Sequence, residues 1–200
     1  APKIVFHPNT ELHRFGGDRG VGVVATAWVP MGTIVWAQCA LDRVFLPEQV
    51  AAYGRTYRHL LEQLCHRNEY GEFVLAWDHG RFVNHDCDAQ VRGLGQRAQI
   101  VVRDIEPGEE ITCDYGECNL DSDLICDCHS PRCRGVVRAN DVLTYADEWD
   151  QQVDHAIRAA LEVSQPLAPF WVDDSLDTMI RRQGAPSIRS LYFQRPLGAP

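Results

Sequence analysis

The stretch between residues 81 and 116 constrains the fold more than any other part of this chain. It begins with a polar turn, RFVNHDC, that carries Asn84 and His85 side by side. The apolar run AQIVV at 98–102 follows, then a Pro-Gly pair at 107–108, and then a β-branched run that ends in the letters DYG. Runs of this kind, separated by proline and glycine, predict two strands joined by a tight turn.

This stretch resembles the core of SET-domain protein-lysine methyltransferases. Their pattern is R-F-x-N-H-x-C, a strand ending in R-D-I, and then G-E-E-[LI]-T-x-D-Y-G, and nearly every position is filled here. The resemblance covers about residues 12–137. It implies a mainly β SET fold with short sheets, helical additions and a C-terminal segment that threads beneath the N-H loop, close to a knot. Inside the motif, Asp86 replaces the usual Ser, and Ala89-Gln90 replace Pro-Asn.

Length and charge set the expected organisation. A chain of 200 residues suits one domain with an appendage. With the resemblance, we expect a SET domain at 1–117 with a helical insert at about 46–70, a post-SET zinc segment at 118–137 and a helical C-terminal extension at 138–200. The absence of a membrane-spanning run and of a signal-peptide pattern predicts an intracellular, cytoplasmic protein, or a nuclear one in a eukaryote. A formal charge of -9 argues against direct nucleic-acid binding and is compatible with basic peptide partners.

A glycine-punctuated turn near the N-terminus is the expected cofactor site. The sequence GGDRGVGVVAT at 16–26 reads as a turn running into a strand, and a Pro-Met-Gly turn at 30–32 precedes a second strand at 33–36. In the family, the first turn lays backbone groups against S-adenosylmethionine, which requires small side chains. The resemblance assigns cofactor binding to seven residues: Arg19, Gly20, Val21, Gly22, Arg81, Asn84 and His85.

His85 has two other interpretations. As a metal ligand it lacks a second histidine at helical or hairpin spacing, and as half of a nucleophilic pair it lies too near Cys87 in sequence for the side chains to converge easily. The resemblance implies instead that the backbones of Asn84 and His85 meet the adenine. It also implies that the Asn84 side chain fixes the crossing of two chain segments.

The expected catalytic residue is Tyr115. A lysine amine has a pKa near ~10.4, so the site must accept a deprotonated nitrogen and align it with the sulfonium methyl. The resemblance implies that the Tyr115 hydroxyl orients this amine; the alternative is a strand-end aromatic with its hydroxyl in solvent. Cys113 stands where relatives carry the Phe or Tyr that governs how many methyl groups fit, and Gln38-Cys-Ala40 stands where they carry Tyr-x-Gly. Both changes predict a larger pocket, for higher methylation states, a bulkier amine or a substrate that is not a protein.

The cysteines indicate a metal. Six of the eight lie within residues 87–133, which in a reducing compartment favours metal over disulfides. The C-x-C-x4-C spacing resembles the post-SET segment, in which three cysteines and the cysteine of N-H-x-C bind one zinc ion. The resemblance implies four zinc ligands: Cys87, Cys126, Cys128 and Cys133. Cys118 and His129 stay open as replacement ligands. The family's aromatic residue after the last cysteine is missing, which leaves Tyr145 or Trp149 to cover the cofactor.

Two helical regions are predicted outside the motifs. Apolar residues at three- and four-residue steps predict a helix over 46–66 that begins at Pro47, with Tyr53 and Tyr57 as core residues rather than channel residues. A second helix is predicted with Thr144 as its cap, ending before Pro166. Its expected apolar face consists of Trp149, Val153, Ala156, Ile157, Ala160 and Leu161. The extension around it is expected to pack on the domain, cover the channel or form a homodimer contact, and the last dozen residues are expected to fray.

We therefore predict a zinc-containing, S-adenosylmethionine-dependent lysine N-methyltransferase of the SET family that acts on a protein or peptide substrate. One alternative is a SET-like enzyme that acts on a small amine or amino acid, which the opened pocket favours. The other is a zinc-stabilised binding module without catalysis, against which the intact Asn84, His85 and Tyr115 argue.

Overall fold

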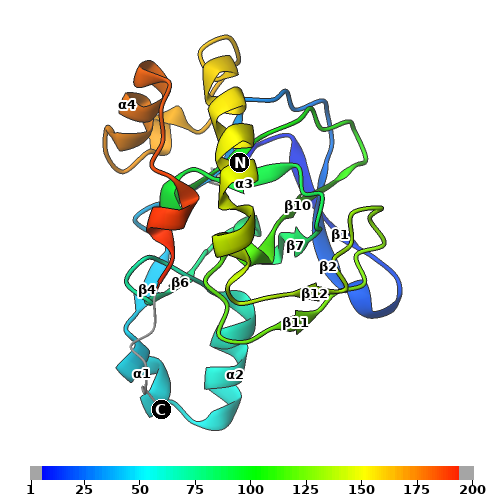
Figure 1. Cartoon of the computed structure of the whole chain (residues 1–200), viewed down its shortest axis with the longest axis vertical. Coiled ribbons are helices and arrows are strands. Elements are labelled where there is room, and N and C mark those ends of the chain that lie inside the picture. The colour runs from blue at the N-terminus through cyan, green and yellow to red at the C-terminus, as the bar shows by residue number, and fades with distance from the viewer. Residues whose placement is uncertain (1–5, 194–200) are drawn as a thin grey trace.

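The computed structural model describes residues 6–193, and a seven-stranded sheet lies at its centre (Figure 1). The strand order is β1-β2-β10-β8-β9-β3, with β7 paired to β10 beside this path. The strands are β1 (Thr10–Arg14), β2 (Val21–Ala25), β3 (Ile34–Ala37), β7 (Asn84–His85), β8 (Val91–Gly93), β9 (Ala98–Val101) and β10 (Glu110–Cys113). The strands expected from the glycine turn, the 98–102 run and the motif are therefore confirmed, and the fold is mainly β.

The insert between the two halves of the sheet contains two helices rather than the one predicted. These are α1 (Pro47–Ala52) and α2 (Arg55–Leu64), and the chain leaves the helical conformation at Tyr53 and Gly54 between them. The prediction of a single helix was wrong. The apolar spacing continues across Gly54, but the first helix ends before this glycine and α2 begins directly after it. A small sheet of β4 (Arg43–Phe45), β6 (Phe73–Leu75) and β5 (His66–Arg67) holds the helices to the body.

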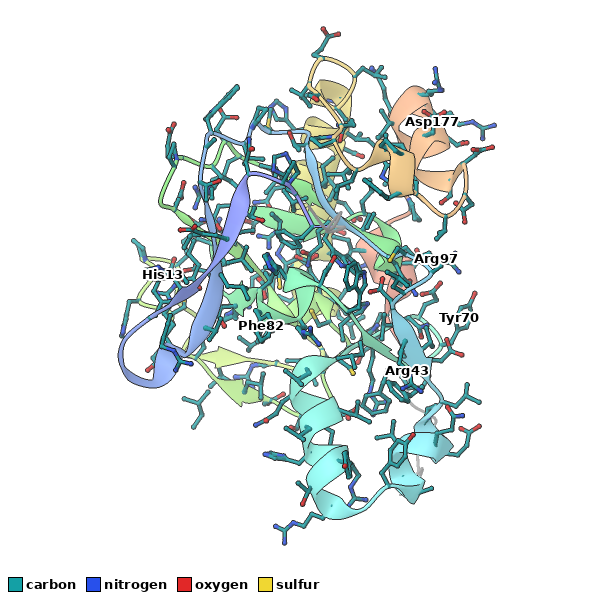
Figure 2. All side chains as sticks on the ribbon, turned by 180° about the vertical axis from the view of Figure 1, so that it is seen from behind. His13, Arg43, Tyr70, Phe82, Arg97 and Asp177 are labelled. Carbon is teal, nitrogen blue, oxygen red and sulfur yellow. The ribbon has the colours of Figure 1, made fainter. Side chains whose placement is uncertain are left out.

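The two insert tyrosines are not core residues. Tyr53 is 42% exposed and Tyr57 is 69% exposed, and their rings contact each other on the outer side of the insert. The prediction that they are buried was wrong, because Phe45, Val50 and Phe73 form the small core of the insert, and Tyr53 meets this core only at its edge, through the ring of Phe45. Figure 2 shows the insert reaching away from the body, with Phe82 near the centre of the molecule and Arg43 beside the insert's sheet.

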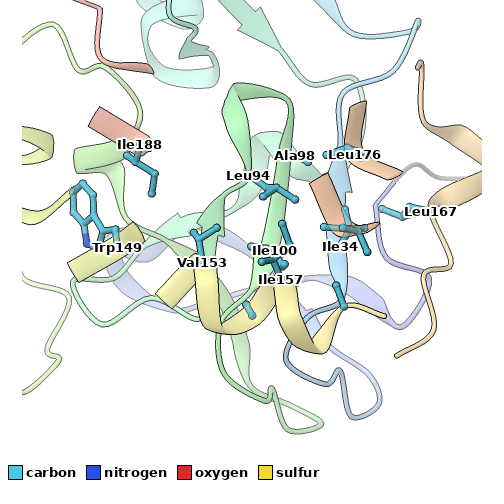
Figure 3. Packing of buried hydrophobic residues seen from close by; sticks show 14 of the residues in the cluster. Ile34, Leu94, Ala98, Ile100, Trp149, Val153, Ile157, Leu167, Leu176 and Ile188 are labelled. Carbon is cyan, nitrogen blue, oxygen red and sulfur yellow. The ribbon is translucent and has the colours of Figure 1, made fainter. Parts of the chain in front are cut away.

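The C-terminal extension packs on the sheet through α3 (Asp141–Ala159). The helix begins one turn earlier than predicted, with Asn140 rather than Thr144 before its first residue. Its predicted apolar face is buried except at Leu161, which is 51% exposed. Figure 3 shows Val153 and Ile157 of this face beside Ile100 of the sheet. Of the three roles considered for the extension, packing on the domain is therefore confirmed.

The remaining elements follow α3 or flank the motifs. The fourth helix is α4 (Ser175–Arg182), and a short hairpin carries the cysteine loop: β11 (Leu124–Ile125) and β12 (Val136–Val137). The part of the chain that the structure describes also contains six 3-10 turns: η1 (Gly17–Arg19), η2 (His79–Phe82), η3 (Gly95–Arg97), η4 (Tyr115–Glu117), η5 (Ala168–Phe170) and η6 (Ile188–Leu191). The frayed end expected for the last dozen residues lies largely outside the described residues. Across 6–193, none of the helices has the length and apolar character needed to cross a membrane.

Candidate active site

Two distant segments of the motif run side by side at the centre of the sheet. β7 pairs with β10 in parallel, with Asn84 opposite Thr112 and His85 opposite Cys113. The second strand ends at Cys113 and not at Tyr115 as its sequence predicts, because the Asp114 carboxylate accepts the Gly116 N–H at 3.0 Å and turns the chain into η4. Tyr115 is therefore the first residue of a buried turn that follows the strand.

The Tyr115 side chain is fixed at both ends. Its hydroxyl donates to the Val83 carbonyl oxygen at 3.0 Å, and its backbone N–H donates to Nδ1 of His85 at 3.1 Å. Burial, reinforced by the nearby Cys113 and Cys118 thiols, raises the Tyr115 pKa far above its ordinary value. The hydroxyl stays neutral at physiological pH. Because its proton is given to Val83, its lone pairs remain free to accept a hydrogen bond.

A largely apolar cavity of about 420 Å³ lies in front of Tyr115 and Cys113. Its wall comes from the sheet, the insert and the C-terminal extension, with contributions from Trp36, Cys65, Val74, Gln99, Ile188 and Leu191. The hydroxyl of a tyrosine at the wall of an apolar cavity suits a ligand with an apolar stem and a hydrogen-bonding end.

The extension is held against this cavity by Asn119. Its side-chain amide donates to the Leu191 carbonyl at 3.0 Å, and its amide oxygen accepts the Phe193 N–H at 2.9 Å. The same amide group reaches the Arg67 carbonyl of the insert at 3.2 Å. Ile188 and Leu191 of the extension line the cavity. The extension therefore also forms part of the cavity wall, in line with the second role considered for it, which was to cover the channel.

Four of the seven predicted cofactor residues converge at the glycine turn. The Asn84 side-chain amide donates to the Val21 carbonyl at 3.2 Å and to the Glu110 carboxylate at 2.8 Å, and Arg19 pairs with the same carboxylate at 2.5 Å. Gly22 has no room for a side chain, because a Cβ there would meet the Glu110 and Asn84 side chains. A residue without a side chain is therefore required at position 22 by its own neighbours, and Glu110 is a residue that the sequence interpretation missed.

Two further cofactor candidates, His85 and Arg81, lie in different places. His85 lies one residue beyond Asn84 on β7. Arg81 instead lines the cavity, and its guanidinium donates to the Trp77 carbonyl at 2.8 Å. Among residues 6–193, the Arg81 Nε–H and the Trp36 indole N–H, both buried, find no hydrogen-bond acceptor. Two unpartnered donors beside one cavity favour a ligand that brings an acceptor, such as a carboxylate.

The predicted metal ligands form one cluster of thiols. The Cys126 Sγ lies 3.7 Å from the Cys87 Sγ and 3.8 Å from the Cys133 Sγ, and all eight cysteines are free. His85, Cys87, Cys126 and Cys128 place their ligand atoms within 4.8 Å of one another. Burial raises the pKa of both Cys87 and Cys126. A cluster of this kind suits a cation that would take the thiols as thiolates.

His85 is closer to this cluster than its sequence predicts. Its Nε2 lies 3.3 Å from the Cys87 Sγ, although the absence of a second histidine argued against a metal role. Of the two replacement ligands considered, Cys118 instead lines the cavity, and neither it nor His129 belongs to the four-residue cluster. The structure therefore offers five candidate ligands, of which His85 also has a partner in the Tyr115 backbone.

A network of buried charges beneath η4 has no counterpart in the sequence interpretation. The Arg134 guanidinium contacts Asp114 at 2.5 Å, and Arg92 contacts Glu117 at 3.0 Å. Burial raises the pKa of Glu117 to about 7, while the charge of Arg92 acts in the opposite direction. In the sequence, the feature that could have indicated this network is Arg134, which directly follows the last cysteine of the C-x-C-x4-C spacing.

Tyr145 and Trp149, the two residues considered as substitutes for the missing aromatic residue, are both held by contacts within the protein. Trp149 is buried in the core, and Tyr145 stacks on it and lies under the Arg134 guanidinium. Both side chains therefore hold α3 in place in this structure, and neither lines the cavity.

Comparison with protein families assigns the central part of the chain. Residues 20–116 match the family model of the SET domain. This stretch is a SET domain. The match begins at the glycine turn and ends in the turn that carries Tyr115, so it includes the parallel pairing of β7 and β10. The SET fold, expected from the motif, is confirmed.

Several curated relatives are similar over parts of this chain. A histone-lysine N-methyltransferase of Cryptococcus neoformans, H3 lysine-36 specific, is 25% identical over 130 residues, which cover 60% of this chain and 16% of the relative. The histone-lysine N-methyltransferase set9 of Aspergillus terreus is 41% identical over 37% of this chain and 11% of its own length. The probable histone-lysine N-methyltransferase set-23 of Caenorhabditis briggsae is 40% identical over 28% of this chain and 27% of the relative.

Solved structures give a further match. The crystal structure of KRYPTONITE in complex with mCHG DNA and SAH has a TM-score of 0.47 and 22% sequence identity, and it covers 68% of this chain and 30% of that chain. The chain thus spans about a quarter or less of the length of the curated relatives described above.

Proposed function

We propose that this chain is an S-adenosylmethionine-dependent N-methyltransferase whose substrate is a lysine side chain of a protein or peptide. The observation that carries the proposal is the Tyr115 hydroxyl, held by Val83 at the wall of an apolar cavity inside a SET domain. Relatives with histone-lysine N-methyltransferase names support the reaction class. The test is methyl transfer from tritiated cofactor onto lysine peptides, histones and a panel of small amines. No incorporation into any acceptor would overturn the proposal.

The residues around the glycine turn fit the cofactor. Gly20 has a positive φ of 69° and open space where a side chain would stand, Gly22 has no room for a side chain, and Asn84 ties this turn to β7. The unpartnered donors of Arg81 and Trp36 suit the carboxylate of the cofactor's methionine moiety. We propose that Arg19, Gly20, Val21, Gly22, Arg81, Asn84 and His85 hold it.

Asn84→Ala is expected to weaken binding of S-adenosylmethionine in calorimetry. The substitution removes the hydrogen bonds to Val21 and to Glu110, each worth about 0.5–1.5 kcal/mol, so affinity should fall by about fivefold to about 150-fold. Glu11→Gln, an exposed change on β1 in the same sheet, is the control and should bind normally. Normal binding by a folded Asn84→Ala protein would remove these residues from the site.

The chain's own residues account for the handling of the amine. Bound S-adenosylmethionine would supply an electrophilic methyl group. The Tyr115 oxygen accepts a hydrogen bond from the amine and thereby aims the nitrogen lone pair, because its own proton is already given to Val83. The raised pKa of Tyr115 excludes it as a phenolate base at neutral pH. The apolar wall of the cavity favours the neutral amine over the ammonium ion.

Cys113 is the proposed determinant of the product. It is buried beside Tyr115 and lines the cavity, where its thiol occupies less space than Phe or Tyr would. Wild-type protein is therefore expected to proceed beyond one methyl group on a lysine peptide, and Cys113→Tyr is expected to shift the products toward monomethyllysine. Mass spectrometry of the products measures this, with Cys39→Ala, which does not line the cavity, as the control. Strict monomethylation by the wild type, or unchanged products in the variant, would contradict it.

The cysteine cluster fits a zinc ion. Four thiols from two segments suit tetrahedral coordination, and the proposed ligands are Cys87, Cys126, Cys128 and Cys133. Bound zinc would join the cysteine loop to β7 and thereby hold the segment that follows Tyr115.

A small-molecule amine is the second candidate substrate. The observation that favours it is the cavity volume of about 420 Å³, which is in the range of pockets that enclose whole small ligands. The acceptor panel separates the two: transfer to small amines at rates above those for every peptide would favour the second candidate.

A further inference from the structure

The turn that carries Tyr115 depends on one buried carboxylate. Asp114 is fully buried, and its Oδ1 closes the turn by accepting the Gly116 N–H at 3.0 Å. The same oxygen receives Nη2 of Arg134 at 2.5 Å. A buried carboxylate without a close cationic partner is costly, so the contact with Arg134 stabilises the turn.

Arg134 is also part of the cysteine loop. It directly follows Cys133, and its backbone N–H donates to the Cys87 Sγ at 3.4 Å. Its guanidinium lies 3.5 Å from Asp141 and over the ring of Tyr145, both on the first turns of α3. One residue thus contacts the cysteine cluster through its backbone and the Tyr115 turn through its side chain.

Two other side chains near this turn belong to the sheet. His85 accepts the Tyr115 N–H, but it lies on β7, which the ladder to β10 holds in place. Arg92 lies on β8, 4.0 Å from Asp114, and is paired more closely with Glu117 at 3.0 Å. Within residues 6–193, the charged contact to Asp114 that comes from the cysteine loop is Arg134.

We propose that Arg134 is a positioning residue that couples metal binding at the cysteine cluster to the conformation of the turn carrying Tyr115. The inference rests on the proposed zinc site and on the proposed role of Tyr115. With the loop closed on the metal, the guanidinium stays on Asp114 and the turn is fixed. With the loop released, Asp114 loses its cation, the cap on Gly116 weakens and Tyr115 loses its defined position.

The test is a cycle of two changes, removal of the metal and removal of the guanidinium. Backbone amide hydrogen exchange of the segment 114–118 is measured on the full chain, zinc-loaded and after chelation, for the wild type and Arg134→Gln. In the wild type, chelation is expected to speed exchange by about tenfold or more. In Arg134→Gln, exchange is expected to be fast in both states although zinc is still bound.

Arg132→Gln is the matched control. Arg132 lies in the same loop and pairs with Glu148 of α3 at 2.5 Å, but it is 52% exposed and does not contact Asp114. This variant should show the wild-type response to chelation. Wild-type protection in zinc-loaded Arg134→Gln, or an equal response to chelation in that variant and the wild type, would overturn the proposal.

Arg134→Lys keeps the proposal testable if the glutamine variant fails to fold. Lysine retains the charge near Asp114 but lacks the fork that also reaches Asp141, so intermediate protection of 114–118 is expected. Protection and metal response equal to the wild type would contradict the inference.

A kinetic measurement adds a second readout. Where methyl transfer is measurable, Arg134→Gln is expected to lower kcat by about tenfold with KM changed less than about twofold, because the turn positions Tyr115 without binding the substrate. Hydrogen exchange requires neither substrate nor cofactor. An inactive wild type would therefore refute the proposed function and leave the coupling to be decided by the exchange data alone.

Discussion

Tyr115→Phe is expected to lower turnover by about 10²-fold or more while cofactor affinity stays nearly unchanged. The hydroxyl removed in this variant is held by Val83 on a residue that lines the cavity, so its loss removes the acceptor proposed to aim the amine. The ring, its packing against His85 and the backbone hydrogen bond to His85 all remain. The measurement is single-turnover methyl transfer together with calorimetry for S-adenosylmethionine.

The pH dependence of this reaction has a defined sign. Because the pKa of Tyr115 is raised, its phenolate is not populated between pH 7 and 9, and turnover is expected to rise with pH as the lysine amine, with a pKa near ~10.4, loses its proton. Tyr53→Phe is the control, since that hydroxyl lies on the exposed insert. Full turnover by Tyr115→Phe would show that the hydroxyl does not act on the amine.

Protein purified without chelator is expected to contain one zinc ion per chain, and Cys126→Ser is expected to lose both the metal and the ordered loop. Structural zinc contributes about 10–16 kcal/mol of apparent binding free energy in small zinc-binding peptides, so loss of a ligand should also lower the melting temperature strongly. Cys126 is the informative position because its sulfur lies in contact with both the Cys87 and the Cys133 sulfurs. Elemental analysis and thermal unfolding provide the measurements.

Cys133 and His85 are both candidates for the fourth zinc ligand, and one variant of each distinguishes between them. Cys133→Ser is expected to release zinc, whereas His85→Ala is expected to retain it, because Nδ1 of His85 is engaged by the Tyr115 N–H and a fourth thiolate is available. Cys39→Ser, outside the cluster, should keep its zinc. Zinc retained by Cys133→Ser and lost by His85→Ala would reverse the assignment, and no zinc in wild-type protein would remove the site.

Patterns over short distances in the sequence carried most of the strand assignments. The β-branched runs at β2 and β9 and the turn at Gly108, which has a positive φ of 85°, could be predicted because each depends on neighbouring residues. The helical insert shows the limit of this approach. Its apolar spacing predicted one buried helix, but burial depends on what lies opposite, and Tyr53 and Tyr57 stay exposed although the ring of Tyr53 contacts Phe45.

In the candidate site, too, some features could be predicted from the sequence and others could not. Cys87 and the C-x-C-x4-C cysteines were assigned by spacing and resemblance, and the structure brings their thiols together. The His85 contact with Cys87 was missed, because neighbours at two-residue separation on an extended chain lie on the same face, and the sequence interpretation weighed a nucleophilic role rather than a hydrogen bond.

The sequence alone determined the family motif, the candidate roles of Tyr115 and Cys113 and four of the five candidate zinc ligands, because each is encoded by residue type at fixed local spacing. Only the tertiary structure decided that Ile188 and Leu191 wall the cavity, that Asn119 holds them there, and that Arg134 reaches Asp114. These contacts join residues that lie far apart in the sequence. Their positions depend on how α3 and the cysteine loop pack against the sheet, and no local sequence pattern specifies that packing.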